Sequence, residues 1–399
     1  MSGLIDPTTA RADIDLAALQ ANVQALAAHA APAQLMVVVK ADGYGHGLVA
    51  CAHAARLAGV PWLGVATPAE ALALREAGDE GRLLVWLYGV EEDLTPLVAA
   101  EVDVSLQSLE QLSDLVAASA VAERRARVHL KIDTGLSRNG APAAVWPDLC
   151  RAVAEAEQAG ALEVVGVWSH LAAADELDHP SVPLQIEAFE RACAEAEAAG
   201  LRPALRHLAN SAAALVRPET HYDLVRVGIA AYGLDPAPGL IARAGLTLRP
   251  VMTLRASLVA VKPLAAGAGV SYGWTWTAPA ATTVGLVPLG YADGLPRHAS
   301  NRGEVGLRGS RAAVRGRICM DQLVVDLGAD TRAAVGEEVV VFGPGDAGEP
   351  TAADWARWSD TIGYEIVSRI GGRVPRRHLG LERFSVLDEA DRPGGPGVA

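Results

Sequence analysis

"LMVVVKADGYGHG", residues 35–47, places a continuous apolar run directly before a lysine and a glycine-rich turn. A short apolar run bounded by turn residues is typical of a β-strand that is buried on both faces. Lys40 stands where this strand is expected to end. Most lysines at a strand end are simply solvated, so the meaning of Lys40 depends on what the rest of the chain builds around it.

The first part of the chain repeats this pattern. Between most of the apolar runs lie Ala/Leu/Glu-rich stretches with helical spacing, and one more such stretch, residues 15–30, precedes the first strand. Eight buried strands that alternate with helices predict a parallel (β/α)8 TIM-like barrel over residues 13–240. An open doubly wound sheet is the structural alternative, but no GxGxxG motif follows the first strand. The seven further runs are residues 62–67, 83–89, 103–108, 127–135, 164–171, 205–211 and 224–233.

The pattern of the sequence changes after about residue 240. Short β-type runs punctuated by glycine predict a mostly antiparallel β domain over residues 241–390. One helix is expected there, at residues 351–370, with Thr351 as its N-cap. We expect residues 1–12 to join the β domain and the Gly/Pro-rich residues 391–399 to be disordered.

Composition narrows the possible partners of the protein. The 399 residues carry a formal net charge of −13 with no basic stripe, so nucleic acid is not an expected partner. Charges and glycines interrupt the apolar segments before they reach membrane-spanning length, and the first residues do not resemble a signal peptide. Four scattered cysteines without CxxC spacing indicate reduced thiols and no zinc site. We therefore expect a soluble, cytoplasmic protein without a metal.

Lys40 would lie at the C-terminal face of the predicted barrel, where the active sites of such barrels are found. An amine flanked by apolar strand can lose its proton through desolvation and act as a nucleophile. This position predicts a lysine that forms a Schiff base with a carbonyl compound.

The ends of the seventh and eighth strands carry residues that suit a phosphate. Asn210 and Ser211 open a helix, and Gly228 and Ile229 lie in a tight turn. Backbone N–H groups and a serine hydroxyl can hold a phosphate there without a lysine. A lysine that faces a phosphate site indicates pyridoxal phosphate. The alternative is that Ser211 is only a helix cap and Gly228 only a turn glycine.

Arg226 lies inside the eighth apolar run, where an arginine is costly unless it is paired. It is either half of a buried ion pair or a hydrogen-bond donor to the pyridine nitrogen of the cofactor. Because arginine is a poor proton donor, it would leave that nitrogen unprotonated. The ring would then be a weaker electron sink, which disfavours transamination.

These segments together resemble the alanine racemase family, whose members are pyridoxal-phosphate enzymes with a barrel and a C-terminal β domain. The resemblance runs in order over nearly the whole chain. It is strongest at "VVVKADGYGHG", "LKIDTGLSRNG", "SHLAAADE", "ANSAAAL", "RVGIAAYG", "GVSYGWTW", "LGYADG", "CMDQ" and "TIGYE".

The resemblance implies a role for individual residues. Lys40 holds pyridoxal 5′-phosphate as an aldimine and is one of two opposed bases, and Tyr272 is the other. Arg226 contacts the pyridine nitrogen with support from His207. Lys131 is a lysine that family members often carry as a carbamate. The other implied cofactor-binding residues are Tyr44, His170, Asn210, Ser211, Gly228, Ile229 and Tyr364, and the implied substrate-binding residues are Arg138, Tyr291, Met320 and Asp321.

The implied activity is the interconversion of L-alanine and D-alanine through an external aldimine, which would supply D-alanine for the cell wall. The resemblance also implies a head-to-tail homodimer in which each site uses Lys40 of one chain and Tyr272 of the other. A broad-specificity or serine-type racemase of the same fold is the main alternative. A related decarboxylase would place an acid, not Arg226, at the pyridine nitrogen, and a non-catalytic pyridoxal-phosphate carrier would lack the β domain.

Overall fold

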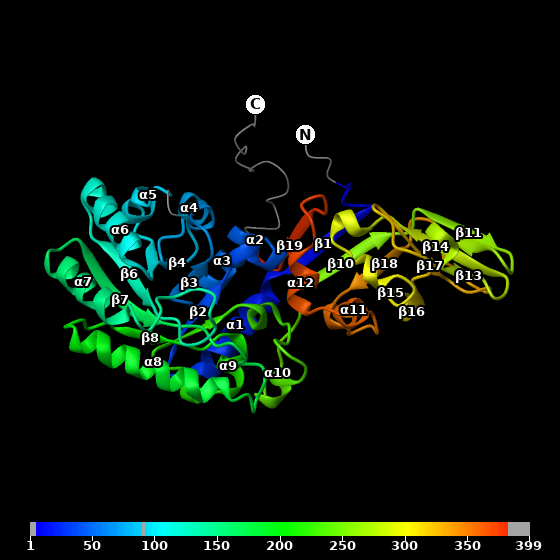
Figure 1. The fold of residues 1–399 in the computed structure, drawn as a ribbon. Helices are drawn as coiled ribbons and strands as arrows, with labels where there is room; N and C mark the ends of the chain where they lie inside the picture. Colours follow the sequence, from blue (N-terminus) through cyan, green and yellow to red (C-terminus); the bar gives the residue numbers. More distant parts are fainter. Residues whose placement is uncertain (1–4, 90–91, 382–399) are drawn as a thin grey trace.

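The computed structural model describes residues 5–89 and 92–381, which form a barrel and a β domain side by side (Figure 1). The segment expected to be disordered, residues 391–399, lies outside the described residues. The two parts make the molecule elongated, with the barrel at one end and the small sheets of the β domain at the other.

The barrel has eight parallel strands in sequence order, which confirms the predicted (β/α)8 fold. Neighbouring strands pair from β2 to β8, and β9 pairs with β2. Backbone hydrogen bonds from Asp223 to Arg206 (3.1 Å) and from Arg226 to Ala209 (3.0 Å) connect β9 with β8. These bonds join the two ends of the sheet, so it is not an open doubly wound sheet. The strands are β2 (Gln34–Val38), β3 (Trp62–Val65), β4 (Arg82–Val85), β5 (Asp103–Leu106), β6 (Ala126–Lys131), β7 (Leu162–Trp168), β8 (Leu205–His207) and β9 (Leu224–Val227).

Helices lie outside these strands, as the helical spacing predicts (Figure 1). Their ends follow ordinary capping chemistry: Thr67 and Glu70 form a capping box on α4, and the Ser108 side chain caps α6. Gly200 follows α8 with φ 99°, which is the left-handed C-terminal position that favours glycine. The helices are α1 (Leu16–Ala30), α3 (Leu48–Leu57), α4 (Pro68–Glu76), α5 (Thr95–Ala99), α6 (Leu109–Ala122), α7 (Trp146–Gln158), α8 (Ser181–Ala198), α9 (Ser211–Val216) and α10 (Leu240–Arg243).

The β domain is mostly antiparallel, as predicted. Its largest sheet has the order β16-β15-β18-β10-β1-β19, in which only β1 and β19 are parallel neighbours. The N-terminal strand β1 therefore belongs to this sheet and runs three residues beyond the predicted boundary at residue 12. Smaller sheets have the orders β11-β14-β17 and β12-β13. The strands are β1 (Ala10–Asp15), β10 (Met252–Ser257), β11 (Ala260–Leu264), β12 (Gly269–Val270), β13 (Trp276–Thr277), β14 (Thr282–Val287), β15 (Glu304–Leu307), β16 (Ser310–Ala313), β17 (Leu323–Asp326), β18 (Glu338–Phe342) and β19 (Arg376–Leu379).

The single helix expected at residues 351–370 is wrong, because two short helices, α11 (Ala352–Ser359) and α12 (Gly363–Ser368), occupy this region. Thr351 is the N-cap of α11, as predicted, and its hydroxyl accepts a hydrogen bond from the Asp354 N–H. Asp360 has φ 56° and ends α11 in a left-handed turn, after which the chain restarts as α12. This break directs α12 towards the barrel.

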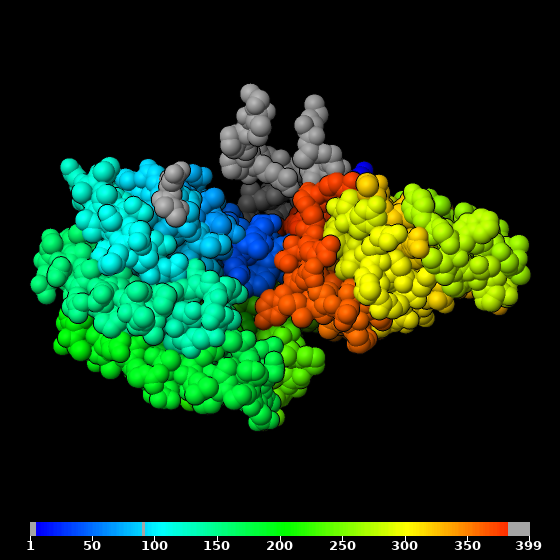
Figure 2. Space-filling model, in the orientation of Figure 1, coloured from blue at the N-terminus to red at the C-terminus, as the bar shows by residue number. Residues whose placement is uncertain are grey.

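The junction between the two parts is formed by α12 and β19 on one side and by a short segment, α2 (Lys40–Gly45), on the other. Arg376 donates a hydrogen bond to the Gly45 carbonyl (3.0 Å), and His378 Nε2 lies 2.9 Å from the His46 carbonyl oxygen. A Cβ atom on Gly45 would lie 2.4 Å from the Val367 carbonyl oxygen, so only glycine permits this approach. Figure 2 shows this blue segment at the surface where the barrel meets the orange C-terminal helices.

Candidate active site

The chain leaves β2 through a left-handed turn. The strand ends at Val38, and residues 41–44 all have φ between 54° and 60°. Non-glycine residues in this conformation cost about 1–2 kcal/mol each. The Ala41 N–H donates to Glu70 Oε1 (2.6 Å), which helps to hold the turn. Backbone strain of this kind is maintained at functional sites, where it fixes a side chain in an otherwise disfavoured position.

The left-handed turn places Lys40 in a half-buried position beside the Trp86 indole. Its amine lies 6.0 Å from the centroid of the Trp86 ring. Burial lowers the pKa of Lys40, and the charge of Arg138 lowers it further, whereas Glu70 acts in the opposite direction. The neutral, nucleophilic form of this amine is therefore more accessible than in an ordinary lysine.

Tyr44, at the end of the same turn, reaches the phosphate site predicted at the seventh and eighth strand ends. Ser211 Oγ accepts a hydrogen bond from the Gly228 N–H (2.9 Å), and Ile229 follows as the first residue of a 3₁₀ turn. A Cβ atom on Gly228 would lie 2.2 Å from the Tyr44 hydroxyl oxygen. Gly228 has φ −103°, so glycine is needed here for space and not for turn geometry.

Two further predicted residues, Asn210 and Tyr364, border the predicted phosphate site. The Asn210 side chain caps α9 by accepting a hydrogen bond from Ala213 N–H (3.1 Å), and the first N–H groups of that helix have no intrahelical acceptor. Tyr364 comes from α12 of the β domain, with its ring centroid 6.4 Å from that of Tyr44. The described chain therefore brings the implied phosphate-binding residues together from both of its parts.

Arg226 is buried and is not half of an ion pair with any described acid. Its two terminal nitrogens donate to the carbonyl oxygens of His207 (2.8 Å), Ser169 (2.8 Å) and Leu208 (3.1 Å). They also lie 3.2 Å from His207 Nδ1 and 3.3 Å from His170 Nδ1. The Nε–H is the one donor of this guanidinium for which the described residues provide no acceptor. The ion-pair interpretation of Arg226 is thus not what the structure shows.

The indole of Trp168 forms a platform under these cations. The His207 ring stacks on it with centroids 5.5 Å apart and an angle of 6°. Arg226 and the Lys131 amine lie 4.8 and 4.1 Å from the Trp168 ring centroid. Burial, together with the charges of Arg226 and Arg138, lowers the pKa of Lys131 to about 7. Arg138 is exposed and pairs with no described acid.

His170 lies within this group of positive charges. Burial lowers the pKa of His170 well below its ordinary value, and the charges of Arg226, Arg138, Lys131 and Lys40 lower it further. A neutral imidazole is the consequence. A site with so many cationic groups suits an anionic ligand, such as a phosphate ester or a carboxylate.

The remaining predicted residues do not meet Lys40 in the single chain. Tyr272 is 69% exposed, on the hairpin between β12 and β13, which lies at the end of the β domain farthest from the barrel (Figure 1). Tyr291 and Met320 are also exposed. Backbone hydrogen bonds hold their two loops together, including one from Ala292 N–H to the Met320 carbonyl (2.9 Å).

Asp321 and the loop of Tyr291 share one arginine. Arg373 donates to Asp293 (2.8 and 3.0 Å), and its Nη2 also donates to Asp321 (2.8 Å). Asp293 is buried and accepts a further hydrogen bond from the Gly290 N–H. The implied substrate-binding residues of the β domain thus lie on loops that are joined by hydrogen bonds.

Several residues of the site were not identified from the sequence, among them Glu70, Trp86, Trp168 and His129. The alternation within "RVHLK" was an available signal, because His129 and Lys131 are two residues apart and share a face of β6. The partners of Glu70 in the turn of Lys40 could not be inferred, because they depend on how the loops after β2 and β3 pack together.

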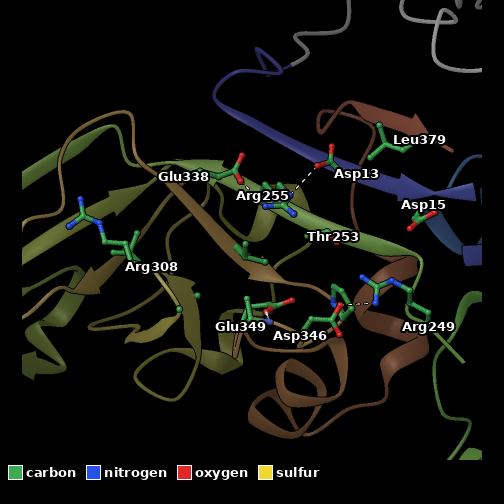
Figure 3. A pocket seen from close by; sticks show the side chains of 16 residues that line it. Asp13, Asp15, Arg249, Thr253, Arg255, Arg308, Glu338, Asp346, Glu349 and Leu379 are labelled. Atoms are coloured by element: carbon green, nitrogen blue, oxygen red, sulfur yellow. Dashed lines mark hydrogen bonds and ion pairs between the residues drawn. The ribbon is translucent and has the colours of Figure 1, made fainter. Parts of the chain in front are cut away.

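A cavity of about 370 Å³ lies elsewhere, on the β domain between β1, β10, β15 and β18 (Figure 3). Its arginines are already paired: Arg249 with Asp346 (2.6 Å), and Arg255 with Asp13 (3.0 Å) and Glu338 (2.6 Å). None of the predicted catalytic or cofactor-binding residues lines it. The candidate site is therefore the one around Lys40.

The fold and this site define a barrel enzyme with an appended β domain and a cationic site at the carboxyl ends of the barrel strands. The chain belongs to the alanine racemase family. The models of the family's N-terminal and C-terminal domains match residues 14–236 and 251–378. This confirms the resemblance seen in the sequence, and it makes the chain an amino-acid racemase by family.

Individual relatives agree with this assignment. The alanine racemase of Streptomyces coelicolor is 54% identical over 375 residues, which cover 93% of this chain and 96% of the relative. That of Thermobifida fusca is 51% identical, with 94% and 99% covered. The crystal structure of alanine racemase from D-cycloserine-producing Streptomyces lavendulae matches with a TM-score of 0.93 at 50% identity, with 96% of this chain and 100% of that chain covered.

Proposed function

We propose that this racemase interconverts L-alanine and D-alanine with pyridoxal phosphate held on Lys40, and that Lys40 and Tyr272 of a second copy are its two bases. The observation that carries the proposal is the juxtaposition at the barrel mouth. A desolvated lysine amine, an arginine with one free N–H and a phosphate-sized cradle lie together there.

The residues present fit this cofactor. Ser211, Gly228 and Ile229, with the first N–H groups of α9 and the Tyr44 hydroxyl, would hold its phosphate. The free Nε–H of Arg226 would donate to its pyridine nitrogen, His170 would lie beside the ring, and Tyr364 would border the phosphate. Pyridoxal phosphate would be held through its aldehyde carbon by the Lys40 amine. Once a substrate amine takes the place of Lys40 on that carbon, the cofactor would withdraw electrons from the amino acid and acidify its α-hydrogen, which leaves the Lys40 amine free to act as a base.

Arg226 moderates that chemistry. The other N–H groups of its guanidinium are engaged by carbonyl oxygens and histidine nitrogens, so the side chain is fixed. Burial lowers the pKa of Arg226 to about 9, at which it is still protonated at neutral pH. It can donate a hydrogen bond without surrendering the proton, which keeps electron withdrawal modest. Return of a proton to the α-carbon would then be favoured over transamination.

Racemisation requires removal of a proton from one face of the α-carbon and delivery of a proton to the other face. The lowered pKa of Lys40 allows this amine to accept a proton on its face. Tyr272 would serve the opposite face, and its exposure at the far end of its own chain supports a second copy as its source. Arg138, Tyr291 and the Met320 N–H would bind the substrate carboxylate, with Asp321 beside them.

Lys131 is proposed to be carbamylated. With a pKa of about 7, a large fraction of this amine is neutral at physiological pH and can react with carbon dioxide. The resulting anion would lie among Arg138, Arg226 and Lys40. It would supply the negative charge that these cations otherwise lack and would orient Arg138.

The cofactor assignment can be tested cleanly because the chain contains only three lysines, Lys40, Lys131 and Lys262. Borohydride reduction of the holoenzyme followed by peptide mapping should place the pyridoxyl group on Lys40. The exposed Lys262 provides the matched control, since the Lys262→Ala protein should carry the pyridoxyl group on Lys40, as the unchanged protein does. Label on Lys131 or Lys262 would refute the assignment.

The substrate assignment needs a panel of L-amino acids, because a broad-specificity or serine-type racemase of the same fold differs in pocket volume alone. We expect D-alanine to be the preferred product when chiral chromatography is used to compare kcat/KM values. A higher kcat/KM for L-serine or a larger amino acid would favour the alternative. A cytoplasmic role in supplying D-alanine for the cell wall is proposed on family membership.

A further inference from the structure

A row of buried polar side chains runs through the inside of the barrel, from Arg226 to the opposite end. His207 Nδ1 lies 3.2 Å from Arg226 Nη1, and His207 Nε2 lies 2.8 Å from His129 Nδ1. His129 Nε2 lies 3.5 Å from Asp103 Oδ1. Asp103 is the first residue of β5, so the row ends near the amino ends of the strands, away from Lys40.

The partners in this row determine where each hydrogen lies. Arginine has only donors, so His207 Nδ1 must offer its lone pair to Arg226, and a neutral His207 then carries its hydrogen on Nε2. That hydrogen points at His129 Nδ1, which must accept it. His129 consequently carries its own hydrogen on Nε2, towards Asp103. A second proton on either ring would set two donors against each other, so both rings are neutral.

The surroundings favour this arrangement. Burial lowers the pKa of His207 well below its ordinary value and also lowers the pKa of His129. Burial alone would raise the pKa of Asp103, but His129 and Arg82 hold it below its ordinary value. Asp103 is therefore an anion, and its distance from His129 is longer than an ordinary hydrogen bond, so their attraction is mainly electrostatic.

We propose that Asp103 and His129 are positioning residues that lock His207 in its Nε2–H tautomer, so that His207 Nδ1 accepts from Arg226 and the free Nε–H of Arg226 stays directed at the site. The stacking of His207 on Trp168 fixes the plane of its ring but not its tautomer, which Arg226 at Nδ1 and His129 at Nε2 fix together. The assignment of the two histidine tautomers does not depend on which reaction the chain catalyses, whereas its consequence for the reaction rests on the proposed function.

Histidine-selective ¹⁵N labelling of the full-length protein, with long-range ¹H–¹⁵N NMR, tests the tautomers directly. We expect His129 and His207 each to give the pattern of a neutral ring protonated on Nε2. Substitution of each histidine in turn identifies its signals. A Nδ1–H tautomer or a doubly protonated ring at either position would overturn the proposal, and this measurement needs neither a variant's activity nor the bound cofactor.

A matched pair of variants tests the positioning role. His129→Asn keeps an acceptor oxygen close to the place of Nδ1, whereas His129→Leu removes it. In the Leu variant we expect His207 to lose its single tautomer and kcat for racemisation to fall roughly 10-fold, the lower end of what loss of a comparable outer partner costs. Pyruvate formed per D-alanine should rise, because Arg226 loses its acceptor at His207 Nδ1.

The Asn variant should keep the tautomer and recover most of the lost rate. If the two variants behave alike, or if His207 keeps its tautomer in the Leu variant, His129 is only a core residue and the proposal fails. Should the Leu variant not fold, the NMR result on the unchanged protein still decides. A chain that shows the expected tautomers but racemises nothing would refute the proposed function and not this inference.

Discussion

Two lysines of the same barrel mouth, Lys40 and Lys131, differ in what surrounds them. Lys40 is held beside Trp86 in a strained turn, with Glu70 partly offsetting the effect of burial on its pKa. Lys131 lies on the Trp168 indole among cations, and its pKa falls to about 7. Lys40 is thus suited to reversible attack on an aldehyde. Lys131 is suited to become an anion by reaction with carbon dioxide.

Replacement of Arg226 by Glu should change which reaction the site favours. A carboxyl group facing the pyridine nitrogen can share a proton with it, so the electron sink becomes stronger. Racemisation should fall by roughly 10²–10³-fold, as expected when a preorganised charged donor is removed. Pyruvate and a long-wavelength absorbance of the bound cofactor should appear, as measured by stopped-flow spectroscopy with L-alanine.

The control for that change is Arg249→Glu, since Arg249 lines the separate cavity of the β domain. It should leave the pyruvate yield unaltered. An Arg226→Glu protein with unchanged spectra and unchanged rate would show that Arg226 only fills the barrel interior.

Carbamylation of Lys131 should be visible by ¹³C NMR of the holoenzyme in ¹³C-labelled bicarbonate. Only the neutral amine reacts, so the carbamate signal should be present above the lysine pKa of about 7 and should decline as the pH falls through that value. The signal should vanish in Lys131→Arg and persist in Lys262→Ala. A bare amine at high bicarbonate, seen in a crystal structure at good resolution, would contradict the proposal.

At the residue scale, residue type and spacing predicted which side chains belong to the site, but not the physical reasons why those residues are needed there. Gly228 was predicted as a turn residue beside a phosphate, yet it is glycine because the Tyr44 hydroxyl occupies the space of a Cβ atom. Arg226 could be placed in a buried strand, but its carbonyl partners on the loops after β7 and β8 are tertiary contacts. No spacing rule predicts such contacts.

At the scale of elements, alternating apolar and helical runs were enough to predict all eight barrel strands, because buried parallel strands have a distinctive composition. Residues 351–370 were predicted as a single helix, because the left-handed conformation of Asp360 cannot be recognised in the pattern of apolar residues. The left-handed turn after Lys40 was equally hidden. Its residues "ADGY" include three that seldom adopt positive φ, and packing against Glu70 and α12 overrides that preference.

The left-handed turn after Lys40 leads to a prediction about stability. Ala41→Gly should raise the melting temperature slightly. Glycine removes about 1–2 kcal/mol of strain from the left-handed conformation. The greater conformational entropy of glycine in the unfolded chain costs only about 0.4–1 kcal/mol. Ala28→Gly, on an exposed helical position of α1, is the matched control and should lower the melting temperature, by the equivalent of about 1 kcal/mol. Equal losses in the two variants would show that the turn is not strained.

At the scale of the whole molecule, the chain separates the two residues that we propose as its bases. Tyr364 reaches the site of its own barrel through α12, whereas Tyr272 is carried to the far end of the β domain. Ser271 and Trp274 have φ of 59° and 45°, so a strained backbone holds Tyr272 in an exposed position. Among the described residues none forms a hydrogen bond with the Tyr272 hydroxyl, which suits the proposal that Tyr272 meets a second copy, and a two-fold pairing of identical chains would complete two sites at once.

Subunit exchange between two inactive variants, Lys40→Ala and Tyr272→Phe, tests this arrangement. If sites are shared, each mixed dimer contains one intact site and one that lacks both bases. Random exchange makes half of the dimers mixed, so activity should return to about a quarter of that of the unchanged enzyme. Lys40→Ala mixed with Arg226→Glu is the control: both changes lie on the barrel, so no intact site can form and activity should not exceed the mean of the two. Continued inactivity of the first mixture after demonstrated exchange would place Tyr272 over the lysine of its own chain.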